Sequence, residues 1–207
     1  MAIKIYGIAR SRAIRNVWAC EEGGVPYELV RTLWTDGGTK TPEFLKINPN
    51  GAVPAMVDGD LALFESLAIN LYIARNHARG LYPAGAQAEG QLFQWTLWAA
   101  TELEPANGGY VTQTVYTPPE KRDPAAIKAA WERMFKPLGV LDGHLAGRTW
   151  MIGDAFSIAD VNVASVLLGT WTNKADFSGW KNLHAWLERC FARPAARKCI
   201  EMRAAAT

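Results

Sequence analysis

The sequence has little cysteine, almost no net charge and no long apolar run. Its 3 cysteines, in 207 residues, form no Cys-x-x-Cys pair and lack the spacing of zinc ligands, so we expect neither a disulfide framework nor a metal site. Lys and Arg number 22 against 20 Asp and Glu, and this near balance creates no global field for nucleic acid or an acidic membrane. The first residues lack the apolar core of a signal peptide, and no segment reaches the roughly 18 apolar residues of a bilayer span. We therefore expect a cytoplasmic protein that binds neither nucleic acid nor membrane.

The composition is that of a globular protein with two differently built parts. Hydrophobic residues make up 49% of the chain and charged residues 20%, which excludes a disordered or fibrous chain. At roughly 150 residues per domain, the length fits one large domain or two small ones. Of the 9 tryptophans, 7 follow residue 90. The two ends of the chain are therefore expected to differ in architecture.

Residues 1–77 alternate strand and helix signals. A strand pattern is followed by a helical pattern, a second strand, a short helix opened by Thr41-Pro42, a hairpin around Asp58-Gly59 and a last helix. The two longer helices are expected to begin at Ser11 and Ser66, because serine is a favoured N-cap residue. The order is βαβ, a short helix, then ββα. It predicts an α/β domain with a sheet of about four strands.

Residues 87–207 carry helical signals only. Asp123-Pro124 pairs an N-cap residue with proline at the first helical position, and Ser157 with Asp160 has the spacing of a capping box. Residues 78–86 contain the glycine and proline typical of a linker. The chain is thus predicted to be a small α/β domain, a linker and an all-α domain.

Three short features of the first part are candidates for chemistry. Ser11 lies at the junction of the first strand and helix, where unpaired N–H groups and a partial positive charge favour an anion. Val53-Pro54 enters a strand, and Glu65-Ser66 puts an acid and a hydroxyl at another helix start. Each feature also has a purely structural explanation: helix capping by the serines, and a trans proline, since X–Pro bonds are cis in only about 5% of cases.

Together, the motifs of the chain resemble those of the cytosolic glutathione transferases, in particular the serine-type, phi-like and bacterial classes. The motifs are, in chain order, Tyr6-Gly7 with Ser11, Asn48-Pro49-Asn50-Gly51-Ala52-Val53-Pro54-Ala55-Met56, Leu63-Phe64-Glu65-Ser66-Leu67-Ala68-Ile69, and Gly153-Asp154-Ala155-Phe156-Ser157-Ile158-Ala159-Asp160. The resemblance spans nearly the whole chain. It implies a thioredoxin-like N-terminal domain with a mixed four-stranded sheet over residues 1–77, and an all-α C-terminal domain over residues 87–207. It also implies a homodimer that uses glutathione as co-substrate.

The resemblance gives five residues a role in glutathione binding. Val53-Pro54 matches the cis-proline turn, in which the Val53 backbone pairs with the cysteinyl part of glutathione. Glu65 is expected to bind the γ-glutamyl ammonium, and Ser66 the γ-glutamyl carboxylate. Lys40 is expected to meet the glycine carboxylate, with a solvated loop lysine as the alternative explanation.

In the same resemblance Ser11 is the catalytic residue, and its hydroxyl donates a hydrogen bond to the glutathione sulfur. A thiol with a pKa near 8.5 is only about 3% thiolate at pH 7. Lowering this pKa by ~2 units requires ~2.7 kcal/mol. A charge-assisted hydrogen bond of about 1.5–3 kcal/mol and a helix N-terminus worth up to ~1 kcal/mol can supply it. No general base is then needed.

The chain departs from the family pattern around the expected sulfur position. Ala52 stands where phi-like members often carry glutamine, so one side-chain contact to glutathione is expected to be missing. Arg10, Arg12 and Arg15 surround Ser11 in the sequence. They either lower the thiol pKa or receive an anionic second substrate, or else they form a solvated basic face.

The second substrate is expected to be a small hydrophobic electrophile bound between the two domains. Arg12, Trp98, Glu102 and Tyr110 are the candidate contacts, although aromatic residues at helical spacing more often belong to a core. The expected reaction is attack of the glutathione thiolate on the electrophile. Reduction of hydroperoxides and release of halide are further reactions that the same thiolate supports.

Two other functions remain open from the sequence. A ligand-binding or interaction protein would keep the fold with little turnover, and the presence of Ser11, Lys40, Glu65 and Ser66 argues against it. A glutathione-dependent isomerase of the zeta-like kind usually carries Ser-Ser-Cys after the first strand, where this chain has Ala9-Arg10-Ser11. The lack of cysteine at this position also disfavours the classes that reduce disulfides.

Overall fold

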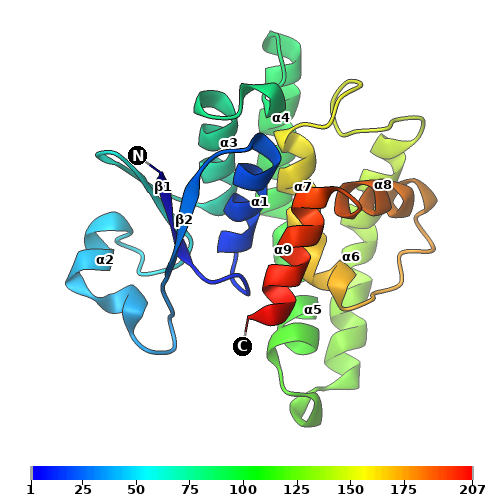
Figure 1. Cartoon of the computed structure of the whole chain (residues 1–207). Coiled ribbons are helices and arrows are strands. Elements are labelled where there is room, and N and C mark those ends of the chain that lie inside the picture. Colours follow the sequence, from blue (N-terminus) through cyan, green and yellow to red (C-terminus); the bar gives the residue numbers. More distant parts are fainter. Residues whose placement is uncertain (1, 207) are drawn as a thin grey trace. The chain divides into compact units, whose positions relative to one another are not determined.

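The chain folds into two compact units. The computed structural model describes residues 2–206. One unit runs to Tyr82 and includes the residues from Ala192 onward, and the other comprises Pro83–Phe191 (Figure 1). This division differs from the expected domains of residues 1–77 and 87–207 with a linker at 78–86, because the C-terminal residues join the first unit.

The first unit is built on a mixed sheet of four strands in the order β2-β1-β3-β4. The strands are β1 (Ile3–Gly7), β2 (Tyr27–Arg31), β3 (Ala55–Asp58) and β4 (Leu61–Phe64). β1 is parallel to β2 and antiparallel to β3, and β3 forms a hairpin with β4. The predicted α/β sheet is confirmed. The hairpin loop is shifted by one residue, because the last residue of β3 pairs with the first of β4 and leaves Gly59 and Asp60 as the loop.

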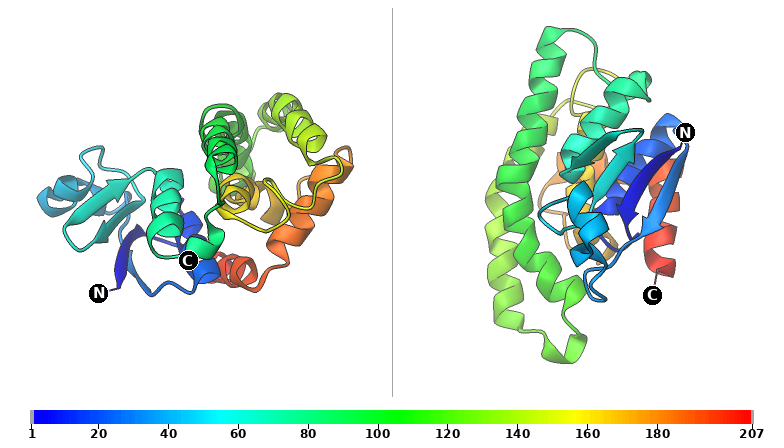
Figure 2. Two further views of the ribbon diagram at one scale, coloured as in Figure 1. Left: turned by 90° about the horizontal axis from the view of Figure 1, so that it is seen from above. Right: turned by 90° about the vertical axis from the view of Figure 1, so that its left-hand side faces the viewer.

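Helices cover both faces of this sheet. α1 (Ala13–Gly23) and α3 (Ser66–Asn76) pack together on one face, and the short α2 (Pro42–Ile47) lies on the other (Figures 1 and 2). Ile3 and Ile5 of β1 are almost fully buried and form part of the core of this unit. This part of the unit also contains two short 3-10 turns, η1 (Gly38–Lys40) and η2 (Arg79–Leu81).

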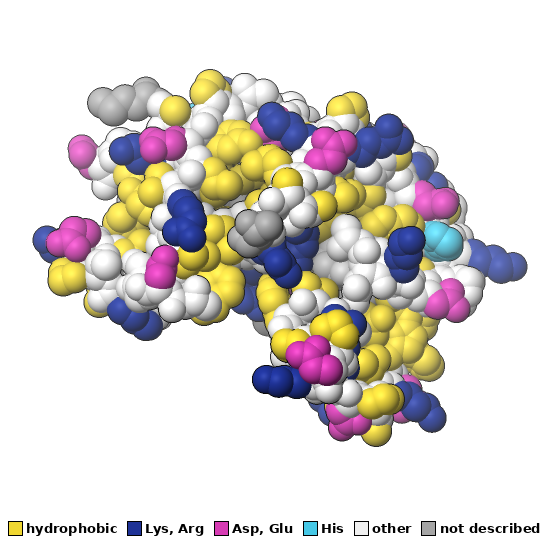
Figure 3. Space-filling view, turned by 60° about the horizontal axis from the view of Figure 1, so that its bottom comes forward, with side chains coloured by type: hydrophobic (Ala, Val, Ile, Leu, Met, Phe, Trp, Pro, Cys, Tyr) yellow, Lys and Arg dark blue, Asp and Glu magenta, His cyan; other side chains and the backbone are white. Residues whose placement is uncertain are grey.

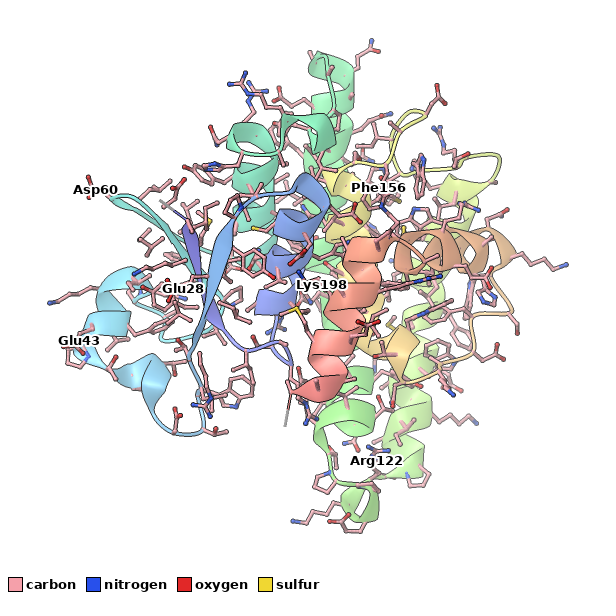
Figure 4. All side chains as sticks on the ribbon, in the orientation of Figure 1. Glu28, Glu43, Asp60, Arg122, Phe156 and Lys198 are labelled. Carbon is pink, nitrogen blue, oxygen red and sulfur yellow. The ribbon has the colours of Figure 1, made fainter. Side chains whose placement is uncertain are left out.

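The C-terminal helix α9 (Pro194–Ala205) belongs to the first unit because it packs against α1 (Figure 1). Two ion pairs join these helices. Lys198 Nζ lies 2.6 Å from Glu21 Oε1, and Arg193 Nη2 lies 2.8 Å from Glu22 Oε2. Lys198 is labelled in Figure 4, on α9 beside α1. Such contacts join residues far apart in the chain, so the helical pattern of residues 194–205 did not reveal them.

The second unit is all-helical, which confirms the predicted class. Its helices are α4 (Ala86–Trp98), α5 (Glu104–Val111), η5 (Pro119–Lys121), α6 (Pro124–Leu145), α7 (Ile158–Thr172) and α8 (Lys181–Phe191). π-helical turns flank α5, η3 (Ala99–Leu103) before it and η4 (Thr112–Tyr116) after it. Pro105 lies in the first turn of α5. Proline removes a backbone donor and disturbs the regular helical ladder, which fits the π turn directly before it.

The capping predictions are confirmed at three helix starts, namely Thr41, Asp123 and Ser157. At the third start the capping box is complete, because Asp160 Oδ2 accepts a hydrogen bond from Ser157 N at 2.9 Å. Asp160 is fully buried, and its Oδ1 accepts from Met151 N and Trp186 Nε1, both at 2.9 Å. One carboxyl group thus joins the segment before α7, the first turn of α7 and α8.

The surface is mixed in charge. On the face shown in Figure 3, Lys and Arg side chains are interspersed with Asp and Glu side chains. None of the helices within residues 2–206 is long and apolar enough to cross a bilayer. In the same part of the chain, no three His, Cys, Asp or Glu side chains are grouped so that they could hold a metal ion.

Candidate active site

Ser11 lies in the turn between β1 and α1. Arg12 is the N-cap residue of α1 and makes no side-chain capping bond, so the prediction that Ser11 is the N-cap is wrong by one residue. The Ser11 hydroxyl is nevertheless bonded to this helix start. Its Oγ accepts from Ala13 N at 3.1 Å and from Ile8 N at 3.3 Å, and it donates to Ile8 O at 2.7 Å. The hydroxyl is therefore held, in a residue that is 5% exposed, at the positive end of α1.

Gly7 brings Ser11 next to the turn at Val53. Its φ is +148°. A Cβ at position 7 would lie 3.0 Å from Ser11 Oγ, 3.6 Å from Val53 Cβ and 2.6 Å from the Cβ of Ala13. The last distance is too short for two carbon atoms, so this backbone conformation and this space both require glycine. Ser11 Oγ and Val53 thus lie within 4 Å of one point, although they are far apart in the chain.

The Val53–Pro54 peptide bond is cis, as the family resemblance implied. Asn48 shapes the loop that leads to it. The Asn48 Nδ2 donates to Ala52 O at 2.6 Å, its Oδ1 accepts from Asn50 N at 3.0 Å, and the residue is 3% exposed. The sequence analysis included Asn48 only as part of a motif and gave it no role of its own. Its turn-forming role follows from the ability of asparagine to bond its own backbone two residues on.

Lys40 approaches the same loop. It is exposed and ends the turn η1. Its Nζ lies 2.5 Å from the point that a Cβ of Gly51 would occupy, so the ammonium lies against the backbone that leads to Val53. The structure thus brings Lys40 to the predicted site. Its role toward the glycine carboxylate stays a prediction.

Glu65 and Ser66 join β4 to α3. Glu65 is exposed and has φ +72°, a backbone region that costs a non-glycine residue about 1–3 kcal/mol and that clusters at functional sites. Within residues 2–206, the only other non-glycine residue with positive φ is Lys174. Glu65 is the N-cap of α3, so the prediction that Ser66 caps this helix is wrong. Ser66 is instead the buried first residue of α3, and its Oγ accepts from Arg15 Nη1 at 3.2 Å.

The three arginines around Ser11 have different environments. Arg10 and Arg12 are exposed, whereas Arg15 is 7% exposed. The interpretation of all three as a solvated basic face is therefore wrong for Arg15. A further cation near this turn was missed by the sequence analysis, because Arg203 Nη1 of α9 donates to Arg10 O at 3.0 Å. Arg15 follows Ser11 by one helical turn, and this spacing was the available signal for its position.

The candidate electrophile contacts of the second unit lie along the run α4–η3–α5. Trp98 ends α4, and its ring packs edge-on against Trp95 with centroids 5.2 Å apart. Glu102 is exposed within η3. Tyr110 of α5 packs against Trp131 with centroids 5.0 Å apart, and burial raises the pKa of its phenol. The packing explains part of the aromatic content, and the electrophile contacts stay predictions.

Comparison with known proteins identifies the family. Residues 1–75 match the glutathione S-transferase N-terminal domain, and residues 109–194 match the glutathione S-transferase C-terminal domain. Glutathione S-transferase 4 of Zea mays is 35% identical over 206 residues, which cover 97% of this chain and 92% of the relative. The chain belongs to the glutathione S-transferase family.

Solved structures of this family agree with the fold of this glutathione S-transferase. The theta class glutathione S-transferase of Xanthomonas axonopodis pv. citri, with glutathione bound, has a TM-score of 0.89 and 31% identity, covering 96% of this chain and 97% of that one. Poplar glutathione transferase F1 has a TM-score of 0.88 and 29% identity and is covered over its whole length. The thioredoxin-like domain with a helical C-terminal domain and the phi-like kinship are thereby confirmed. The chain is a glutathione transferase, and the alternatives of a carrier or an isomerase are not favoured.

Proposed function

We propose that this glutathione transferase attacks small hydrophobic electrophiles with the thiolate of glutathione, and that Ser11 stabilises this thiolate. The observation that carries the proposal is that Ser11 Oγ and Val53 Cβ both lie within 4 Å of the point that a Cβ of Gly7 would occupy. A glutathione whose cysteinyl part pairs with the Val53 backbone has its sulfur close to Ser11 Oγ. The N-terminus of α1 adds a favourable field for negative charge there.

The hydroxyl of Ser11 has one proton, and this limits what it can contribute. In the structure that proton is donated to Ile8 O. A bond to sulfur therefore replaces a neutral hydrogen bond worth about 0.5–1.5 kcal/mol with a charge-assisted one worth about 1.5–3 kcal/mol. With up to ~1 kcal/mol from the helix N-terminus, the total lowers the thiol pKa by about 1–2 units. This is sufficient to make thiolate the major form at pH 7 or slightly above.

The two ends of glutathione are proposed to meet opposite charges. The Glu65 carboxylate receives the γ-glutamyl ammonium, and Ser66, at the first turn of α3, receives the γ-glutamyl carboxylate through its hydroxyl and backbone N–H. The Lys40 ammonium, beside Gly51, receives the glycine carboxylate. These assignments use the charges of both ends of the tripeptide, as specific recognition requires. We propose that the electrophile is contacted by Arg12, Trp98, Glu102 and Tyr110.

We also propose that the protein is a cytoplasmic homodimer with a role in detoxification. Exposed apolar side chains on both units support an association surface. Leu61 and Phe64 of β4 are each 39% exposed, and Phe93 and Leu97 of α4 are 44% and 64% exposed. Contiguous exposed apolar side chains are typical of interfaces, and Phe93 and Leu97 are neighbours one helical turn apart on α4. Light scattering on the purified protein tests dimerisation, and the variant Leu97→Glu is expected to shift the particle mass toward that of one chain. A particle mass of one chain in the unmodified protein would contradict dimerisation.

One experiment tests the catalytic proposal. Glutathione binding is measured by calorimetry, and the ultraviolet absorbance of the thiolate is followed against pH on the same sample. We expect micromolar to millimolar affinity and a bound-thiol pKa below the value of about 8.5 for the free thiol. Binding without a change in thiol pKa would mean that the site holds glutathione without activating it. Absence of binding would overturn the proposal.

A further inference from the structure

Arg15 is a buried cation that bonds directly to the proposed carboxylate site. It is 7% exposed, and within residues 2–206 it is the only Lys or Arg among the buried residues. Its Nη1 lies 3.2 Å from Ser66 Oγ, across the contact between α1 and α3. A buried charge is costly unless hydrogen bonds and opposite charges compensate it. A guanidinium at this place therefore requires an explanation.

A second residue of α1 holds the same turn of α3. Asn16 is fully buried, and its Nδ2 donates to Ser66 O at 2.7 Å and to Asn70 Oδ1 at 2.8 Å. Arg15 and Asn16 thus bind the hydroxyl and the carbonyl of the same serine. The first turn of α3 is fixed from the side of α1, and Ser66 cannot turn its hydroxyl freely.

The direction of the hydrogen bond between Arg15 and Ser66 is the central point. A guanidinium only donates, so Ser66 Oγ must be the acceptor. The single proton of the hydroxyl therefore stays available to a different acceptor. The backbone N–H groups of the first turn of α3 have no partner within the helix. All these groups are donors, and a positive charge lies behind them, which is an environment for a carboxylate.

We propose that Arg15 is a positioning residue for the γ-glutamyl carboxylate of glutathione. It holds Ser66 Oγ as an acceptor, so that the Ser66 proton is donated to the ligand, and its charge favours an anionic ligand at this turn. The proposal rests on the proposed binding of glutathione and adds to it the residue that orients Ser66. Arg15 thereby has a different role from the exposed Arg10 and Arg12.

The test compares three ligands that differ at one group. They are glutathione, γ-aminobutyryl-cysteinylglycine, which lacks the γ-glutamyl carboxylate, and glutaryl-cysteinylglycine, which lacks the γ-glutamyl amine. Calorimetry measures their affinities for the unmodified protein, Arg15→Gln and Arg15→Lys. The matched control is Arg79→Gln, since Arg79 is an exposed arginine of η2 in the same unit.

We expect Arg15→Gln to weaken glutathione and glutaryl-cysteinylglycine by about 10- to 100-fold, the range for a charge-assisted hydrogen bond. The affinity for γ-aminobutyryl-cysteinylglycine, which lacks this carboxylate, is expected to fall by less than about 3-fold. Arg15→Lys keeps the charge without the fork geometry and is expected to show the same selectivity with a smaller loss. If Arg15→Gln does not fold, as urea unfolding will show, the selectivity of Arg15→Lys alone tests the proposal. Arg79→Gln is expected to change none of the affinities.

Equal losses for all three ligands would mean that Arg15 only supports the packing of α1 against α3, and this would overturn the inference. Unchanged affinities would overturn it as well. The double variant with Ser66→Ala gives an independent check, because the effect of Arg15→Lys must shrink when Ser66 Oγ is absent. Additive losses would contradict the orienting role. If the unmodified protein binds no glutathione, the proposed function and this inference both fail, whereas failure of the inference alone leaves that binding intact.

Discussion

Ser11→Ala is the substitution that most directly tests how the thiolate is stabilised. It removes the donor to sulfur and also the acceptor for Ala13 N and Ile8 N. The loss of these two acceptors in a residue that is 5% exposed is expected to lower the stability of the protein by about 1–3 kcal/mol. The catalytic effect must therefore be separated from this structural effect.

The catalytic magnitude follows from the competition for the Ser11 proton. The bond to sulfur gains about 1–2 kcal/mol over the bond to Ile8 O, so its loss raises the bound-thiol pKa by about 0.7–1.5 units. If the unmodified protein has a bound-thiol pKa of about 6.5, the thiolate fraction at pH 7 falls by about 2- to 8-fold. At pH 6 it falls by about 4- to 25-fold, and at pH 9 it hardly changes because the thiol ionises without help.

The assay is the rate of conjugation at saturating glutathione, measured from pH 6 to pH 9 for both proteins. Ser157→Ala is the matched control, because Ser157 is also a buried serine that bonds to a helix start. This control is expected to lower stability and to leave the pH profile unchanged. If Ser11→Ala slows the reaction equally at every pH, or not at all, Ser11 does not stabilise the thiolate.

Three further predictions concern strain, the buried carboxyl group and the thiols. Glu65→Gly should raise the free energy of unfolding by about 1 kcal/mol, because it relieves the positive φ, and should weaken glutathione binding by at least about 10-fold; a loss of stability in urea unfolding, or unchanged affinity, would contradict it. Asp160→Ala should lower the free energy of unfolding by about 3–5 kcal/mol, because buried donors lose their acceptor, and a loss below about 1 kcal/mol would refute this. Cys20, Cys190 and Cys199 are all 0% exposed, and burial raises the pKa of the Cys20 and Cys199 thiols to about 12. A thiol reagent at pH 8 should therefore modify none of the three before urea unfolds the protein, and rapid labelling of the folded protein would contradict this.

Local rules predicted much of the fold because the relevant interactions lie within one helical turn. The capping oxygens of Thr41, Asp123 and Ser157 accept hydrogen bonds from N–H groups at most three residues later in the chain. Because these residue types are favoured N-caps, the sequence itself indicates the helix starts. The same rule failed at Ser66. The backbone of Glu65 turns to positive φ there, and the hydroxyl bonds to α1 instead of capping α3.

Contacts between distant segments could not be read from local patterns. The helical character of α9 is evident from its residues. It packs against α1, and the ion pairs of Glu21 with Lys198 and of Glu22 with Arg193 lie at this contact. On an isolated helix these charged side chains would be exposed. The sequence pattern is therefore the same whether or not another helix supplies an opposite charge. For the same reason, the sequence pattern does not distinguish the buried Arg15 from the exposed Arg10 and Arg12.

The amino-acid sequence alone was enough for the fold class, for three of the five expected helix starts and for the types of residue that glutathione chemistry requires, because these depend on local backbone preferences and on motif spacing. The tertiary structure was needed to show which of these residues meet. Gly7 brings Ser11 Oγ to Val53, and α1 brings Arg15 to Ser66, 51 residues later in the chain. Such contacts depend on how whole elements pack. A buried polar contact between two elements does not change the hydrophobic periodicity of either one, so the sequence pattern does not indicate it.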